Sequence, residues 1–146
     1  MPTLTPTRQR GFEYLDEPGI DPATRCRSLR DVGRANALFG GTHAVLAELE
    51  PVLRGLGPRV TLLDVGSGLG DIPQRARASA ARLGVRMETF GLDSATELGP
   101  IIRTRGSVAL CGDARFLPFR DRSVDVVICS QTLHHFVGDE VLTLVR

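Results

Sequence analysis

Residues Val60–Pro73, read as VTLLDVGSGLGDIP, join an apolar run to a closely spaced set of glycines. The run 60–65 is apolar or β-branched except for Asp64, which is typical of a strand buried on both faces. Three glycines follow, at Gly66, Gly68 and Gly70. A helical period begins at Asp71. A strand, a glycine-rich turn and a helix in this order let the backbone approach a ligand closely, so the stretch predicts a ligand-binding turn.

The spacing of the glycines separates two classes of cofactor. Dinucleotide-binding proteins use the pattern G-x-G-x-x-G. Here the third glycine comes one position early, at Gly70, and Asp71 stands where that pattern has its last glycine. A carboxylate there would face a pyrophosphate, which is electrostatically unfavourable. An NAD-dependent oxidoreductase is therefore the less favoured interpretation, and a turn with incidental glycines is a further alternative.

Composition excludes several classes of function. The chain has 146 residues, 42% of them hydrophobic, and a net charge of +1, as expected for about one globular domain. Near-zero net charge gives no reason to expect nucleic acid as a partner. The sequence shows no signal peptide, and no apolar run approaches the roughly 20 residues of a membrane span. The three cysteines and three histidines lack metal-ligand spacing. We therefore expect a cytoplasmic protein without a metal site.

The remaining elements alternate between strands and helices. Two amphipathic helices precede the first strand; one begins at Asp21 and ends at Gly40-Gly41, and Thr42 is expected to cap the other. Further strands are predicted over the ranges Val85–Leu92, Ser107–Cys111 and Ser123–Ser130, the last as a buried strand. Gly99-Pro100 is expected to interrupt the helix before the third strand. This order favours an α/β fold with a mostly parallel sheet.

Two acids stand at the ends of predicted strands. Asp93 lies 23 residues after Gly70, where a carboxylate in a β-α-β unit reaches ribose hydroxyls. The alternative is that Asp93 or Ser94 caps a helix. Asp113 lies 20 residues after Asp93 and, with the next backbone N–H, has the donors and acceptors to read adenine. The alternative for Asp113 is a solvated loop acid.

Four segments resemble one known family in order and spacing: LDVGSGLG, GLDSA, GDARFLPF and SVDVVICSQTLHHF, between residues 63 and 136. Together they resemble the class I S-adenosyl-L-methionine-dependent methyltransferases that act on small molecules, in the subgroup of the ubiquinone and menaquinone biosynthesis enzymes. The resemblance implies a Rossmann-like α/β fold with helices on both faces of the sheet, preceded here by the two N-terminal helices. We accordingly divide the chain into an arm with cap helices (1–57) and a partial cofactor-binding domain (58–146).

The resemblance also implies the site. The residues that would bind S-adenosyl-L-methionine are Asp64, Gly66, Ser67, Gly68, Gly70, Asp93, Ser94, Asp113, Ala114 and Ser130. Ser130 would offer its carbonyl to the ammonium group of the cofactor. His134 and His135 fall where some relatives place residues facing the methyl group, and they are the candidate catalytic bases. Phe12, Tyr14 and the Gly40-Gly41 turn are candidates on the side of a small-molecule acceptor.

The resemblance further implies a sheet of seven strands, of which this sequence supplies four. The fourth strand would then lie at an open edge, which favours a homodimer or another chain that covers it. We expect a methyltransferase or the cofactor-binding half of one. The alternative is a fragment, a truncated product or a partner-binding chain without catalysis.

Overall fold

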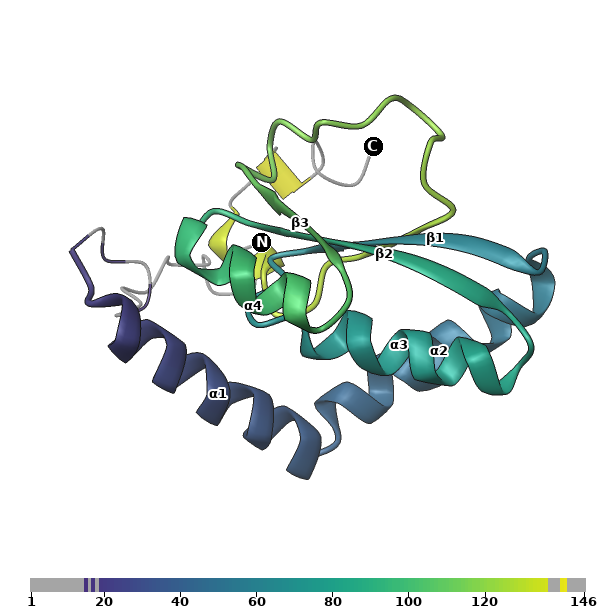
Figure 1. Ribbon diagram of the computed structural model, residues 1–146, viewed down its shortest axis with the longest axis horizontal. Helices are drawn as coiled ribbons and strands as arrows, with labels where there is room; N and C mark the ends of the chain where they lie inside the picture. The colour runs from purple at the N-terminus through teal and green to yellow at the C-terminus, as the bar shows by residue number, and fades with distance from the viewer. Residues whose placement is uncertain (1–14, 16, 18, 137–139, 142–146) are drawn as a thin grey trace, which may run out of the picture.

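The computed structural model describes residues 15, 17, 19–136 and 140–141 (Figure 1). The predicted acceptor-side residues Phe12 and Tyr14 lie outside them. The elements are α1 (Pro22–Leu38), α2 (Gly41–Gly55), β1 (Arg59–Val65), α3 (Asp71–Arg82), β2 (Arg86–Asp93), the 3-10 helix η2 (Thr96–Leu98), α4 (Gly99–Thr104), β3 (Val108–Cys111), β4 (Val126–Ile128) and the 3-10 helix η3 (Leu133–His135).

The strands form one parallel sheet in the order β3-β2-β1-β4. The β1–β2 register runs from Arg59 opposite Arg86 to Val65 opposite Leu92. The chain therefore moves from β1 outward to β3 on one side and then crosses to β4 on the other. Ligands of open α/β sheets bind at such a reversal, outside the carboxyl ends of the strands. The predicted α/β, Rossmann-like architecture is confirmed.

The two faces of the sheet are covered differently in the described residues. Helices α2, α3 and α4 all lie on one face (Figure 1), where Leu53 and Ala76 pack with Leu62 of β1. Segment 112–125 covers the other face, and Phe119 meets Phe90 of β2 edge to face at a centroid distance of 5.5 Å. Helices were expected on both faces of the sheet. In the described residues helices cover only one face, and segment 112–125 supplies the apolar layer on the other.

The two N-terminal helices exist as predicted, but only the first has the predicted cap. The Asp21 carboxylate accepts a hydrogen bond from the Thr24 N–H at 2.8 Å and so begins α1. Thr42 does not cap α2: Gly40 holds that position in the left-handed region, at φ +86°, and Thr42 is buried inside the helix. A glycine supplies this turn without a side-chain cap because it has no Cβ to clash.

One prediction about the later elements is confirmed and one is wrong in detail. The helical segment before β3 is short and broken as expected: η2 ends at Leu98 and the six-residue α4 begins at Gly99-Pro100, since proline fits a first helical turn whose N–H groups have no partner in the helix. Strand β4 is shorter than predicted and not buried, with Val127 56% exposed. Among the described residues β4 pairs only with β1. The Asp125 carboxylate accepts from the Thr61 N–H beside the start of β4, and Gln131 turns the chain at φ +58° after its end.

The boundary predicted at residues 57 and 58 stays a prediction. Helix α2 lies before it, yet Leu49 and Leu53 belong to the same apolar cluster as Val60 and Ala80. This packing favours α2 as part of the same cooperative unit as the sheet.

Replacing Leu53 with alanine tests whether α2 and the sheet unfold as one cooperative unit. Leu53 is 1% exposed, so Leu53→Ala should lower the free energy of unfolding by about 2–5 kcal/mol through lost burial and a cavity. Urea unfolding followed by circular dichroism measures the change. Val52→Ala, on the exposed side of α2, is the matched control and should change it little. A Leu53→Ala chain that unfolds in two transitions, with the sheet unaffected, would make α2 a separate unit.

Candidate functional site

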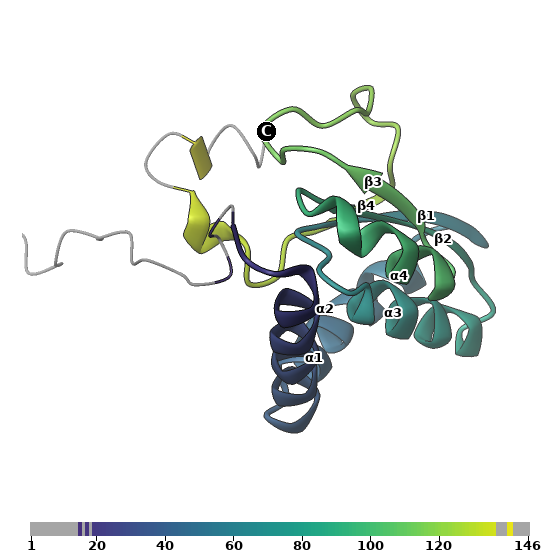
Figure 2. The same cartoon turned by 60° about the vertical axis from the view of Figure 1, so that its left-hand side comes forward.

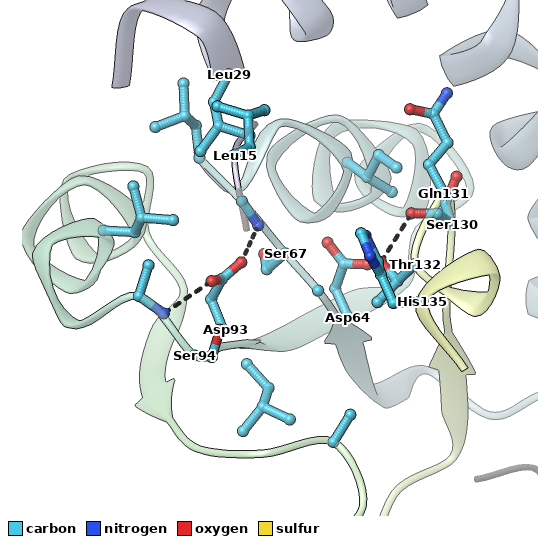
Figure 3. A pocket seen from close by; sticks show the side chains of 18 of the residues that line it. Leu15, Leu29, Asp64, Ser67, Asp93, Ser94, Ser130, Gln131, Thr132 and His135 are labelled. Carbon is cyan, nitrogen blue, oxygen red and sulfur yellow. Dashed lines mark hydrogen bonds between the residues drawn. The ribbon is translucent and has the colours of Figure 1, made fainter. Parts of the chain in front are cut away.

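A cavity of about 800 Å³ opens at the carboxyl ends of the strands (Figure 3). It is lined by most residues of the predicted site: Asp64, Gly66, Ser67, Gly68, Asp93, Ser94, Asp113, Ala114, Ser130, His134 and His135. Gly70 does not line it. Gly70 instead precedes the first residue of α3 at φ +77°, close to Ile102 of α4. The structure thus brings these predicted residues together at one cavity, whereas Gly70 belongs to the packing beneath it.

The glycine loop is held tightly to the strands around it. The N–H groups of Gly66 and Ser67 both donate to the Leu92 carbonyl at 2.9 Å. The Gly68 N–H donates to the Asp93 carboxylate at 2.8 Å, and the Gly70 N–H donates to the carbonyl of Ser67. These donors are therefore engaged within the protein. A pyrophosphate needs such N–H groups for itself, so the loop does not favour a dinucleotide.

Gly66 is also required by close packing. Its φ is +73°, and a Cβ there would overlap the side chain of Thr132, in the segment after β4. The loop after β1 and the segment after β4 thus meet at the centre of the site, which only a residue without a side chain permits.

Asp93 ties the loop to the end of β2. One carboxylate oxygen accepts from the Gly68 N–H and the other from the Ala95 N–H at 3.0 Å (Figure 3). Burial raises the pKa of Asp93, while these two N–H groups and the charge of Arg25 lower it. Each carboxylate oxygen has further lone pairs, so Asp93 holds the loop and can still accept from a ligand.

Asp64 is the most deeply buried acid of the cavity, only 2% exposed. Burial raises its pKa to about 7; the dipole of the nearby Ser67 hydroxyl lowers that pKa, and the charge of Asp93 raises it further. The Ser67 Oγ atom is itself buried and reaches hydrogen-bonding geometry with no described group. Neither Asp64 nor Asp93 has an ion-pair partner among the described residues. The cavity therefore suits a ligand that is positively charged and carries hydrogen-bonding groups.

Asp113 is engaged by a residue that the sequence did not single out. The Arg115 guanidinium donates to both Asp113 oxygens, with Nη2 at 2.6 Å, and this holds the pKa of Asp113 at about 2. The pair is about half exposed, so its contribution to stability is small. Arg115 also lies 3.5 Å from Glu140. An adenine read by Asp113 would share that carboxylate with Arg115.

The segment after β4 brings the remaining predicted residues to the cavity. The carbonyl of Ser130 accepts from the Thr132 hydroxyl at 3.2 Å (Figure 3). The rings of His134 and His135 stack at a centroid distance of 4.1 Å, tilted by 39°. Both histidines line the cavity, so either side chain is placed to face a ligand within it.

Helix α1 contributes a set of cavity residues that was missed. They recur at one helical face: Arg25, Leu29, Gly33 and Asn36. Figures 1 and 2 both place α1 and η3 at the end of the sheet where the strands finish. Arg25 pairs with Glu97 of η2, with side chains only 16% and 23% exposed, and Asn36 pairs with Gln131 after β4. The spacing is visible in the sequence, but two of the four residues are polar and one is glycine, so an apolar stripe does not reveal it.

Asp64 should make stability depend on pH. Because its folded pKa lies above its ordinary value, its favourable contribution is complete at low pH and is lost as pH rises from about 4 to about 7. Asp64→Asn should therefore gain stability relative to the wild type over that range, by roughly 4 kcal/mol from the shift. Urea unfolding at several pH values measures it, with Asp121→Asn on the exposed loop as control. A difference that does not vary with pH would contradict the buried, protonated acid.

No described helix combines the length and apolar character of a membrane span. No three described His, Cys, Asp or Glu side chains gather as a metal site would require.

Known proteins resemble the chain in sequence and in structure. The model of a family described as "Methyltransferase domain" matches residues 63–146. An uncharacterized methyltransferase of Schizosaccharomyces pombe is 31% identical over 84 residues, which are 56% of this chain and 32% of that protein. The chain thus spans about a third of the length of this curated relative.

Solved structures agree in fold. A SAM-dependent methyltransferase from Aquifex aeolicus superposes with a TM-score of 0.60 at 18% identity, over 86% of this chain and 65% of the other. The plantazolicin methyltransferase BpumL in complex with SAH gives a TM-score of 0.55 at 17% identity, over 82% and 46%. At these identities the likeness concerns the fold alone, whereas the family match covers more than half of the chain. The chain therefore belongs to the methyltransferase domain family and has the fold of the S-adenosyl-L-methionine-dependent enzymes.

Proposed function

We propose that this chain binds S-adenosyl-L-methionine in the cavity at the carboxyl ends of β1, β2 and β4, and that it takes part in methyl transfer to a small organic acceptor. The observation that carries the proposal is the pair Asp64 and Asp93. One acid is buried and the other half-buried, both line the same cavity, and neither forms an ion pair with a described residue. Such a site favours a ligand with positive charge, and the cofactor brings a sulfonium and an ammonium group. The family match supports the same choice.

The residues of the cavity fit the parts of this cofactor. Asp93 would accept from the ribose hydroxyls at the end of β2. The loop with Asp64, together with the Ser130 carbonyl, would hold the amino-acid end, and the unpartnered Ser67 hydroxyl is one donor that a ligand could satisfy. Asp113 and Ala114 would meet the adenine. When bound, the cofactor supplies a methyl group on a good leaving group, so the protein mainly contributes alignment.

His134 and His135 are proposed to lie on the acceptor side. A base is needed only if the acceptor is a hydroxyl or a protonated amine, and a histidine titrates near neutral pH. The proposal has three further parts. They are the similarity to quinone-biosynthesis enzymes, a cytoplasmic location, and a homodimer or partner chain over the edge of β4. The exposed Val127 on β4 supports the last of these.

A second candidate function is cofactor binding without catalysis, because the acids of the cavity that would hold the cofactor do not depend on an acceptor. The chain spans 32% of its relative in Schizosaccharomyces pombe, so transfer by the whole protein is a separate proposal. Binding and transfer are therefore tested separately, and binding comes first.

Calorimetric titration with S-adenosylhomocysteine tests the cofactor. The wild-type chain should bind it, and Asp93→Ala should weaken binding by about 10- to 100-fold, because hydrogen bonds to a charged group contribute about 1.5–3 kcal/mol. Circular dichroism checks that the variant is folded, and Asp121→Ala is the control outside the cavity. Unchanged affinity in Asp93→Ala would refute the ribose assignment, and tight binding of NADH would revive the dinucleotide interpretation.

A further inference from the structure

The cavity offers few donors for an anionic group. The Gly66, Ser67 and Gly68 N–H groups already donate within the protein. The two lining arginines are engaged as well: Arg25 pairs with Glu97 and donates to the Glu17 carbonyl, and Arg115 pairs with Asp113 and Glu140. Arg25 thus contacts an acid that follows β2. Arg115 contacts one acid that follows β3 and, in addition, Glu140. A carboxylate lying near Ser130, after β4, therefore needs donors other than these backbone N–H groups and arginines.

The side-chain amides of Asn36 and Gln131 supply such donors. The Asn36 Nδ2 donates to Gln131 Oε1 at 3.2 Å, and the Gln131 Nε2 donates to Asn36 Oδ1 at 2.6 Å. This reciprocal pair uses one hydrogen of each NH₂ group and leaves the second hydrogen of each for another acceptor. Both residues line the cavity. Gln131 directly follows Ser130, whose carbonyl is the proposed acceptor for the ammonium group.

The backbone supports a functional role for this pair. Gln131 has φ +58°, a left-handed conformation that is uncommon for a residue other than glycine and that gathers at functional sites. On α1, Asn36 lies 11 residues after Arg25, which is about 16 Å along the helix. The helix thus reaches from Glu97, beyond β2, to Gln131, beyond β4. Its two polar contacts stand over opposite ends of the cavity.

Resting on the proposed function, we infer that the Asn36–Gln131 amide pair binds the carboxylate of the amino-acid end of S-adenosyl-L-methionine. Neutral amides suit this place because they give N–H donors without repelling the ammonium and the sulfonium beside them. A lysine or arginine would bring a further positive charge next to those two groups. The carboxylate would then lie between the amide pair and the ammonium of the same ligand, and the Ser130 carbonyl would hold that ammonium.

Two ligands that differ only in the carboxylate test the inference. S-Adenosylhomocysteine carries it, and S-adenosyl-3-thiopropylamine keeps the nucleoside, the thioether and the amine but lacks it. Calorimetry on the wild-type chain should show a preference of at least about tenfold for the first ligand. Gln131→Glu and Asn36→Asp replace an NH₂ donor by an acceptor of nearly the same size. Each should weaken the first ligand by about tenfold or more and leave the second unchanged or tighter.

The matched control is Gln74→Glu, an exposed amide on α3 outside the cavity, which makes the same change of charge and should alter neither affinity. Equal weakening of both ligands would overturn the inference and leave the pair as a structural contact between α1 and the β4 segment. Unchanged affinity for S-adenosylhomocysteine in both variants would overturn it too. If the folded wild-type chain bound neither ligand, the proposed function itself would fail, and the inference with it.

Discussion

The attachment of the glycine loop to the end of β2 determines the arrangement of the site. The Leu92 carbonyl accepts from two successive N–H groups of the loop, and the next residue, Asp93, accepts from a third. These bonds turn the donors of the loop toward the sheet. The same loop in a nucleotide-phosphate site would need them to face the ligand. The cavity is consequently poor in donors and rich in acceptors, which selects a cationic ligand.

Helix α1 completes the cavity from outside the sheet. Two of its polar contacts reach Glu97 and Gln131, and between them the apolar side chain of Leu29 packs against the cluster that contains the loop residue Leu69. These partners follow β2, β4 and β1 respectively. One helix therefore holds the three segments that form the site in a fixed relation. Its own surface next to the cavity is mixed in polarity, since it faces both the apolar loop and a polar ligand.

The sequence predicted those parts of the fold that depend on local pattern. Apolar runs with glycines identified β1 and the loop, and Asp93 could be placed because its distance from Gly70 fits one β-α-β unit. Prediction failed where distant contacts decide the outcome. Thr42 is a good capping residue, yet it is buried while Gly40 makes the turn. The engagement of Asp113 by Arg115 depends on how one loop folds back, which no spacing shows.

The same reasoning explains why Asn36 and Gln131 were missed. They are 95 residues apart, neither is a charged or catalytic type, and Gln131 needs a left-handed backbone before its amide can reach α1. Asp64, by contrast, could be recognised from the sequence. Its position in an apolar strand already marked it as unusual, because an acid is buried there only where something compensates for its loss of hydration.

The need to compensate for the lost hydration of Asp64 links the stability of the fold to the binding of a ligand. A cationic ligand near Asp64 favours its ionised form, so binding would offset part of the free energy that burial of the charge costs. The same carboxylates would attract the neutral thioether of the product less strongly than the sulfonium of the substrate. An acceptor-rich cavity would thus discriminate between the two states of one cofactor by a single charge. The amide pair over the amino-acid end would hold both states alike, since the carboxylate that it binds does not change in the transfer.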